Sequence, residues 1–405
     1  MRRDIDRLMN EQGLAGLVVL ALDRYSPAMY YMTGQKIHVG LYVRASNGHA
    51  HLVVDPMERD QAAASGIDHS TLTQHGWVQR VERESKPLRA WAGLIADMLE
   101  NLGIKGRVAF YGEATVGNGW ELIEALRAKR PDLVIDDTHP DVLTRARQTK
   151  DDDEVANIRR SSEGIVAAWD SLVAYVRTLR RDGETVVDGM RAVKLGDLRA
   201  LLHREFVARG LEGGESIVAQ GRDAGVPHNR GNDEELLRPG APVIVDIFPG
   251  EAGGGYFSDF TRTFCVGVAP EPVKRAWDDV HSAFREAMGA MRVGEPCRSL
   301  NEKVCDVFEA RGHATRRTDP SLQEGYVHSL GHGVGLSIHE APLLGGPPSN
   351  LDKLEPGMVV TVEPGLYYPS RGLGVRIEDT VVMRADGGFE NLTPAAYELE
   401  ILIPA

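Results

Sequence analysis

Five side chains in the C-terminal half of the chain have the types needed to bind metal ions. They are four carboxylates and one imidazole: Asp246, Asp259, His332, Glu363 and Glu378. Such a set is large enough to hold two divalent ions, and its hard oxygen donors favour Mn²⁺, Co²⁺, Fe²⁺ or Zn²⁺ over a thiolate zinc site. Two metal ions side by side polarise a carbonyl group and generate hydroxide near neutral pH. These residues therefore predict metal-assisted hydrolysis.

Three further histidines accompany the predicted ligand His332. His332 lies in GHGVGLSIHE, residues 331–340, where Gly alternates with apolar residues and no helix is predicted. His328 and His339 flank it, and His339 precedes a loop where its ring could donate to a developing oxyanion. His228 lies upstream in the turn-rich segment VPHNRG. Taken one at a time, these three are better explained as surface or packed histidines than as catalytic ones.

The four carboxylates lie on two predicted β-hairpins. In the first, residues 243–246 lead into a turn and residues 258–264 return; in the second, the strands are 359–363 and 375–381. Each hairpin has one carboxylate near the end of its outgoing strand and one near the start of its returning strand. In an antiparallel pair such residues lie across from each other, within several ångström.

A weak internal repeat precedes these hairpins. Two helical patterns come before each hairpin, at residues 154–180 and 195–209 and again at 271–291 and 298–311. The C-terminal part is therefore predicted to be a duplicated helix–helix–hairpin unit. If the two sheets join, the four carboxylates meet at one place.

The burial expected for these acids separates a metal site from simpler explanations. Asp246 follows three apolar residues, and a buried carboxylate must be paired, protonated or bound to metal. Each acid alone is readily explained as a turn cap. Together they would repel one another unless cations neutralise them, and Arg262 and Arg376 could do so only in part. A salt-bridge network without metal remains the alternative, although it does not explain why a histidine, His332, lies between the two hairpins in the sequence.

Composition limits the partners and the compartment. With 405 residues two domains are expected, and the net charge of −13 without a basic block argues against nucleic acid. Cys265, Cys297 and Cys305 lack metal-binding spacing and are expected to be reduced thiols. The N-terminus lacks the features of a signal peptide, and no apolar run could span a bilayer, so we expect a cytoplasmic protein without membrane partners.

The first 150 residues predict a smaller α/β domain. Apolar strands alternate with helical patterns there: a helix at 2–13, strands at 17–21, 51–54, 107–111 and 133–135, and helices at 87–102 and 119–130. Tyr30 to Gly34 is expected to be a short extended piece. The acidic residues 151–154 are typical of a helix start. We place the domain boundary near Lys150, which gives domains of residues 1–150 and 151–405.

Four motifs carry a resemblance to a known family. They are VDIFPG with SDFTRTF, HSLGHGVGLSIHEAP, GMVVTVEPGLY and GVRIEDTVV. In order and spacing they resemble the creatinase–methionine aminopeptidase superfamily, peptidase family M24, and within it the Xaa-Pro peptidases prolidase and aminopeptidase P. The resemblance implies an α+β fold with a pita-bread C-terminal domain, a creatinase-type N-terminal α/β domain and a homodimer. It also implies two divalent metal ions, Mn²⁺ in the first place with Co²⁺ or Zn²⁺ as alternatives.

The resemblance also implies roles for individual residues. Asp246 and Asp259 would hold one metal, Asp259, His332 and Glu363 the other, and Glu378 would bridge both. Glu363 would in addition carry the proton of the attacking water. On the substrate side the implied catalytic or contacting residues are His228, His328 and His339, with Arg376 as a supporting substrate-side residue.

The chain departs from the family between its histidine motif and Glu363. Dipeptide-specific prolidases carry an arginine there that clamps the free carboxylate of the substrate. Residues 341–355 of this chain contain no arginine, and Lys353 is their only basic residue. The clamp would then come from elsewhere, with Arg44 or Lys36 of the N-terminal domain as candidates. The Asp246–Asp259 turn is also slightly longer than in familiar members.

The leading hypothesis is an enzyme, a Xaa-Pro dipeptidase acting on small peptides. The alternatives are an aminopeptidase P-type enzyme, a lyase or hydrolase acting on a small non-peptide metabolite, and a peptide-binding module without activity. Creatinase itself uses this fold without metals and lacks the ligands, so the five ligands argue against it. Cleavage of Ala-Pro compared with Ala-Pro-Ala separates the two peptidases, and metal content separates the enzymes from the binding module.

Overall fold

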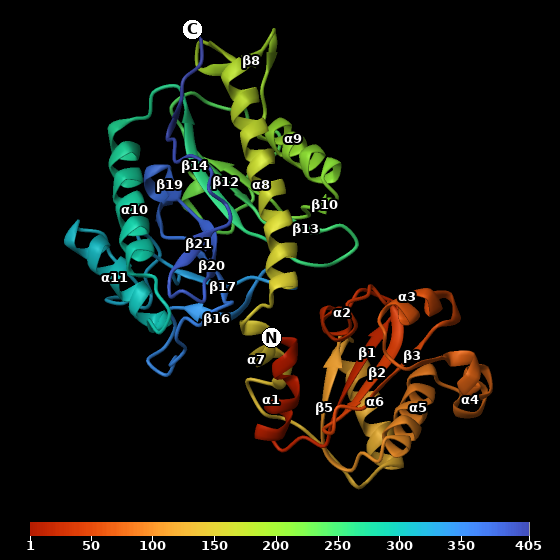
Figure 1. Cartoon of the computed structure of the whole chain (residues 1–405). Helices are drawn as coiled ribbons and strands as arrows, with labels where there is room; N and C mark the ends of the chain where they lie inside the picture. The colour runs from red at the N-terminus through yellow and green to blue at the C-terminus, as the bar shows by residue number, and fades with distance from the viewer. Residues whose placement is uncertain (405) are drawn as a thin grey trace. The chain divides into compact units, whose positions relative to one another are not determined.

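The computed structural model describes residues 1–404, which divide into two compact units. The first unit comprises Met1–Arg147 together with Gly253–Gly255, and the second comprises the remaining residues (Figure 1). The break in the chain after Arg147 lies close to Lys150, where the sequence places the boundary.

The first unit is built on one mixed sheet of six strands in the order β4-β3-β2-β1-β5-β6. The strands are β1 (Gly16–Leu22), β2 (Val39–Ala45), β3 (Ala50–Val54), β4 (His69–Thr71), β5 (Gly106–Gly112) and β6 (Leu133–Ile135). The helices are α1 (Ile5–Glu11), α2 (Pro27–Thr33), α3 (Arg59–Ala64), α4 (Trp77–Glu84), α5 (Pro87–Asn101), α6 (Val116–Lys129) and α7 (Val142–Gln148). Apolar residues of α5 and α6 share one core with the central strands. The predicted alternation of strands and helices is confirmed.

The extended conformation expected for Tyr30 to Gly34 is wrong, because this stretch forms helix α2. The Ser26 hydroxyl caps the helix by accepting a hydrogen bond from the Met29 amide at 3.3 Å, and Pro27 occupies the first turn. Gly34 ends the helix with a φ of 68°. The capping residues therefore outweigh the strand propensity of the two tyrosines.

The second unit contains the four predicted helices in the predicted order. They are α8 (Asp152–Thr178), α9 (Leu195–Ala208), α10 (Glu271–Ala290) and α11 (Cys297–Ala310). Helix α8 begins with a reciprocal cap in which Asp151 accepts from the Glu154 amide at 3.1 Å and Glu154 accepts from the Asp151 amide at 3.0 Å. Within the acidic residues 151–154, which predict a helix start, Asp151 and Glu154 therefore cap the first turn of α8.

Two sheets of the second unit meet where the carboxylates lie. A four-stranded sheet has the order β11-β12-β14-β22 and a five-stranded sheet has the order β16-β15-β17-β20-β21. Their strands are β11 (Ile217–Gln220), β12 (Pro242–Ile247), β14 (Phe260–Val266) and β22 (Glu400–Ile401), then β15 (Gly331–Gly333), β16 (Glu340–Leu344), β17 (Val359–Val362), β20 (Asp379–Met383) and β21 (Phe389–Asn391). An isolated bridge between Thr261 and Glu378 connects them, with the Glu378 amide donating to the Thr261 carbonyl at 3.0 Å. The predicted joining of the two hairpins is therefore seen in the structure.

The second hairpin differs from its prediction. Strand β17 pairs with β20, but the chain between them leaves the sheet and forms a separate ribbon of β18 (Gly365–Tyr368) and β19 (Leu373–Arg376). The break falls at Pro364, which has no amide hydrogen to continue the ladder. Glu363 and Glu378 directly follow and precede the last β17–β20 pair, Val362 with Asp379. In the first hairpin Asp246 pairs with Thr261, so Asp259 lies just before its strand.

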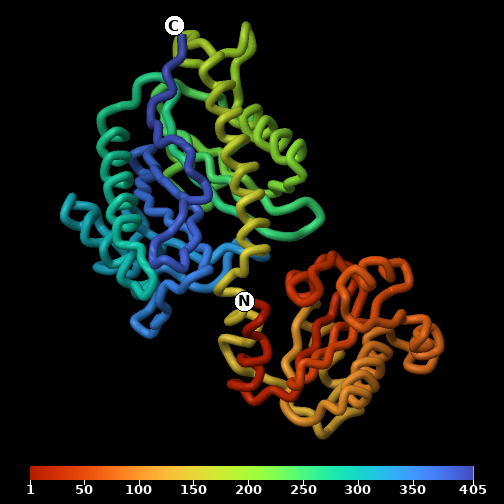
Figure 2. Tube along the Cα trace, viewed as in Figure 1, coloured from red at the N-terminus to blue at the C-terminus, as the bar shows by residue number. Residues whose placement is uncertain are grey.

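Each sheet is covered by the two helices that precede its hairpin. Helices α8 and α9 share a buried core with β12 and β14, and α10 and α11 share another with β17, β18, β19 and β20. The Cα trace shows the two helix pairs on the outside of the unit, with the sheets between them (Figure 2). The remaining short strands are β7 (Arg180–Asp182), β8 (Thr185–Asp188), β9 (Arg191–Ala192), β10 (Leu211–Glu212) and β13 (Gly250–Glu251). Across residues 1–404, none of the helices carries an apolar stretch long enough to cross a bilayer.

Candidate metal centre

The predicted ligands converge between the two sheets of the second unit. Single ligand atoms of Asp259, His332 and Glu378 lie within 4.8 Å of one another. The Nε2 atom of His332 is 3.6 Å from Asp259 Oδ2 and 3.5 Å from Glu363 Oε1. These distances are too long for hydrogen bonds but short enough for the three groups to contact one cation.

The orientation of the His332 ring also fits a cation. Its Nδ1 atom is 3.1 Å from the carbonyl oxygen of Gly333, which can only accept, so Nδ1 carries the proton. Burial lowers the pKa of His332 to about 4, so at neutral pH the ring is uncharged and Nε2 presents a lone pair. That lone pair faces two carboxyl groups, an arrangement that is repulsive unless they are protonated or a positive ion lies between them. A second ring nitrogen bound to a backbone carbonyl is typical of metal-ligating histidines.

Glu378 has one carboxylate oxygen without a partner. Its Oε2 atom accepts a hydrogen bond from the Thr261 hydroxyl at 2.7 Å, whereas Oε1 is buried and has no hydrogen-bond partner within residues 1–404. Glu378 is 1% exposed, so bulk solvent does not reach that oxygen. Buried polar atoms are almost always satisfied, and a missing ion is one of the explanations for an exception.

The cluster retains protons at neutral pH in the absence of metal. Burial raises the pKa of Glu378 to about 8, and the charge of Asp246 adds to this effect. Burial and the neighbouring carboxylates also raise the pKa values of Asp259 and Glu363 well above their usual range. Divalent cations would favour the ionised carboxylates instead and would release these protons on binding.

The two arginines considered for a salt-bridge network do not neutralise the cluster. Arg376 is buried and pairs with Asp246. Arg262 pairs with Asp379 through Nη2 at 2.8 Å, and its Nη1 atom donates to the carbonyl oxygen of Glu378 rather than to the carboxylate. One arginine is therefore available to four carboxylates. The residues present fit divalent cations better than a network of protein charges.

Sequence reasoning missed Tyr367, which connects two predicted residues. The Tyr367 hydroxyl accepts from Arg376 Nη1 at 2.7 Å and lies 2.9 Å from His328 Nε2. His328 Nδ1 is 2.7 Å from the Ser329 carbonyl and must donate to it, and burial lowers the pKa of His328 to about 3. The neutral ring therefore accepts a hydrogen bond from Tyr367 through Nε2. The adjacent tyrosines of β18, whose side chains alternate between its faces, were the available signal.

His339 lies beside the cluster, and His228 is exposed nearby. The ring centroids of His339 and His332 are 4.5 Å apart in an edge-on arrangement. Burial and the charge of His228 lower the pKa of His339, which places the two histidines in the same electrostatic environment. His228 follows a short turn after β11 and its side chain is exposed. The side chains of both histidines are exposed to solvent.

Of the basic residues considered as a clamp for the substrate carboxylate, Arg44 already has a carboxylate partner. Arg44, on β2 of the first unit, donates to both carboxylate oxygens of Asp6, at 2.9 and 2.8 Å. Lys353 is exposed, and its backbone forms an isolated bridge with Pro296. The prediction that Arg44 or Lys36 clamps a substrate stays a prediction.

The duplicated helix–helix–hairpin fold and its buried, oxygen-rich cluster are together typical of a metal-dependent hydrolase. The model of metallopeptidase family M24 matches residues 156–385 of the chain. The chain therefore belongs to metallopeptidase family M24, and its resemblance to the Xaa-Pro peptidases of that family is confirmed.

Individual relatives agree with this assignment. The chain is 30% identical over 302 residues to the Xaa-Pro dipeptidase of Pyrococcus furiosus, which covers 74% of this chain and 75% of that protein. It is 35% identical over 265 residues to the probable dipeptidase PepE of Mycobacterium tuberculosis, which covers 65% of this chain but only 63% of that protein. The solved structure of a Xaa-Pro dipeptidase from Bacillus anthracis superimposes with a TM-score of 0.79 at 22% identity and covers 99% of this chain and 98% of that one. The likeness to that structure confirms the predicted α+β pita-bread fold.

Proposed function

We propose that this chain is a metal-dependent peptidase that cleaves the bond between an N-terminal residue and proline in a dipeptide. The observation that carries the proposal is the buried cluster itself, in which His332 Nε2 faces two carboxylates and Glu378 Oε1 has no protein partner. The similarity to the Pyrococcus furiosus Xaa-Pro dipeptidase supports the choice of substrate.

The cluster would hold two divalent cations. The proposed ligands are Asp246, Asp259, His332, Glu363 and Glu378, with Mn²⁺ as the first candidate because four of the five are hard oxygen donors. When bound, such ions supply Lewis acidity and a water molecule of lowered pKa. The bridge between Thr261 and Glu378 fixes the two sheets to each other, so ligands from both hairpins keep their spacing.

Glu363 is the proposed proton carrier. It is half-buried and directly follows β17, and its amide donates a hydrogen bond to the Leu330 carbonyl at 2.8 Å. Burial and Glu378 raise the pKa of its carboxyl group, so the group can hold a proton taken from the attacking water and then pass it to the leaving amine.

His339 is the proposed donor to the oxygen of the scissile carbonyl. Its lowered pKa keeps the ring neutral, and a neutral imidazole has one N–H to donate. A donor placed where negative charge develops stabilises the transition state more than the ground state. The exposed His228 would contact the proline side of the substrate.

His328 acts through other residues. Because its two ring nitrogens are engaged by Ser329 and Tyr367, it has no N–H left for a substrate. Tyr367 in turn receives a hydrogen bond from Arg376, which holds Asp246. This chain of contacts would position Asp246 for metal binding, so we assign His328 and Arg376 to positioning.

An aminopeptidase that removes one residue from a longer peptide is the second candidate. The observation in its favour is the absence of arginine from residues 341–355, since a dipeptide offers a free carboxylate that needs a cationic partner. Arg44 could serve only by leaving Asp6. The homodimer implied by the family resemblance is part of the proposal, because a second copy could contribute such a cation.

Hydrolysis of Ala-Pro and Ala-Pro-Ala tests both candidates on the full chain. The protein is purified, its metal content is measured, and each peptide is assayed with added Mn²⁺ or Co²⁺ and again after EDTA treatment. Cleavage of Ala-Pro alone supports the dipeptidase, and faster cleavage of Ala-Pro-Ala supports the aminopeptidase. Absence of cleavage in a metal-loaded sample refutes both, and activity that survives complete metal removal refutes the metal centre. Size-exclusion chromatography with light scattering tests the dimer.

A further inference from the structure

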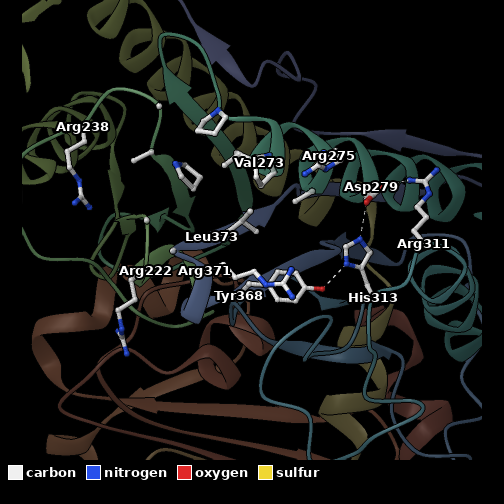
Figure 3. Close-up of a pocket in the computed structure, with 18 residues that line it drawn as sticks. Arg222, Arg238, Val273, Arg275, Asp279, Arg311, His313, Tyr368, Arg371 and Leu373 are labelled. Atoms are coloured by element: carbon white, nitrogen blue, oxygen red, sulfur yellow. Dashed lines mark hydrogen bonds and ion pairs between the residues drawn. The ribbon is translucent and has the colours of Figure 1, made fainter. Parts of the chain in front are cut away.

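The second unit contains a pocket that plays no part in the proposed peptidase site. It has a volume of about 890 Å³ and lies among the turn after β11, the start of β12, the first turns of α10 and the turn between β18 and β19 (Figure 3). Pockets that bind small molecules typically measure roughly 300–1,000 Å³. The size therefore suits an organic ligand rather than a single ion.

Strand β18 separates this pocket from the candidate metal centre. Successive residues of a strand point to opposite faces, and the two tyrosines at the end of β18 do so. Tyr367 contacts His328 and Arg376 on the metal side. Tyr368 lines the pocket, where its hydroxyl is 2.7 Å from His313 Nδ1. The pocket is therefore a separate site.

The lining of the pocket is strongly cationic. Among its residues the only carboxylate is Asp279, whereas five are arginines: Arg222, Arg238, Arg275, Arg311 and Arg371. The chain as a whole carries a net charge of −13, so this concentration of positive charge runs against the composition. Clefts lined by one sign of charge attract ligands of the opposite sign.

Three of the arginines have a carboxylate partner, and in two of these pairs the arginine side chain is largely exposed. The pairs are Arg222 with Asp223 at 3.1 Å, Arg238 with Glu235 at 2.7 Å and Arg311 with Asp279 at 2.9 Å. The side chains of Arg222 and Arg238 are 70% and 53% exposed. Exposed ion pairs are weak, so a ligand anion can compete for these guanidinium groups.

The other two arginines make no ion pair within residues 1–404. Arg275 is exposed on α10, and the Arg371 guanidinium stacks on the Tyr368 ring with its carbon 4.6 Å from the centroid. The Glu324 carboxylate near Arg371 is engaged by the Ser370 amide at 2.9 Å and its hydroxyl at 2.8 Å. Stacking leaves the N–H edge of Arg371 available to a ligand.

A hydrogen-bonded chain fixes the ring on which Arg371 stacks. His313 connects the Tyr368 hydroxyl to Asp279, with Nε2 at 2.9 Å from Asp279 Oδ2 (Figure 3). Apolar side chains of Val273 and Leu373 lie in the same pocket. The pocket thus combines several guanidinium groups with an aromatic and apolar wall.

We propose that this pocket binds a phosphate-bearing organic molecule. Guanidinium groups match the oxygens of phosphate in geometry and charge, and they bind it through paired, charge-assisted hydrogen bonds. The positive end of α10, a helix of 20 residues, opens onto the same space and adds to the attraction. The apolar wall would hold the organic part. The inference does not depend on the peptidase activity.

Calorimetric titration of the full-length protein with AMP and with inorganic phosphate tests the proposal. We expect saturable binding of AMP with a dissociation constant of about 1 mM or tighter, and weaker binding of phosphate alone. Arg275→Glu and Arg371→Glu should each weaken AMP binding by about tenfold or more, because each loses charge-assisted contacts to the phosphate. Both side chains are exposed, so folding should be retained, and circular dichroism checks this.

Arg204→Glu is the matched control, since Arg204 is likewise an exposed helical arginine that makes no ion pair among the described residues, and it lies outside the pocket. It should leave AMP binding within about twofold of the wild type. Equal weakening by Arg204→Glu would show a general charge effect and overturn the site. Binding that depends on bound metal but not on Arg275 or Arg371 would place AMP at the metal centre and also overturn it. Equal affinities for AMP and phosphate refute the organic ligand, and no saturation by either up to about 10 mM refutes the pocket as a binding site.

Discussion

Replacement of Glu378 by glutamine should stabilise the metal-free protein while impairing the metal-loaded one. The Glu378 carboxyl group has a pKa of about 8 in the folded protein, against an ordinary value of 4.5. Above pH 4.5 this carboxyl group ionises more readily in the unfolded chain than in the folded one, which lowers the free energy of unfolding. The contribution of the protonated Glu378 to the free energy of unfolding is fully present below pH 4.5 and is lost as the pH rises towards 8. At pH 7 the loss amounts to about 3 kcal/mol, and at pH 5 to less than about 1 kcal/mol. Glutamine cannot ionise, so Glu378→Gln should recover these amounts.

Thermal and urea denaturation of EDTA-treated protein measure this gain. For a unit of this size, about 3 kcal/mol corresponds to a rise in Tm of roughly 6–12 °C at pH 7, and the rise should nearly vanish at pH 5. Added Mn²⁺ should then stabilise the variant less than the wild type, because the variant has lost a proposed ligand.

The control for this prediction is Glu286→Gln, which removes an exposed carboxylate from α10 and should change stability by less than about 0.5 kcal/mol at either pH. A metal-free Glu378→Gln protein no more stable than the wild type at pH 7 would refute the reasoning. An equal gain at pH 5 and pH 7 would refute it as well, since the effect would then not come from ionisation.

Three further substitutions test individual contacts of the centre. His332→Ala should abolish turnover and lower the metal content measured by mass spectrometry, and an active, metal-replete variant would contradict the proposed ligand set. His339→Ala should reduce kcat by roughly 10²–10³ with metal content unchanged, and a loss of metal instead would show a ligand rather than an oxyanion donor. Arg376→Met should destabilise the EDTA-treated protein by about 3–5 kcal/mol in urea because it leaves Asp246 buried and unpaired. The surface variant Arg384→Met should change stability by less than about 1 kcal/mol, and equal effects of the two would show that the buried pair is not special.

Much of the fold was predictable because local pattern and tertiary environment agree. The four long helices of the second unit begin and end close to where their apolar periodicity and capping residues indicate. Both hairpins were recognisable from apolar strands broken by Gly and Pro. The prediction was wrong at Tyr30, where strand propensity and helix capping compete. There the cap formed by Ser26 favours helix α2.

The sequence by itself determined which chemistry is available, because residue type and order along two repeated hairpins name four acids and one histidine. The tertiary structure decided how these groups are paired. Asp246 pairs with Arg376 and not with Arg262. The Tyr367 hydroxyl forms hydrogen bonds with both Arg376 and His328. The two arginine–aspartate pairings join residues more than 100 positions apart, and only the packing of the two sheets fixes which atoms meet. The same packing leaves Glu378 Oε1 without a protein partner, which no pattern along the chain could reveal.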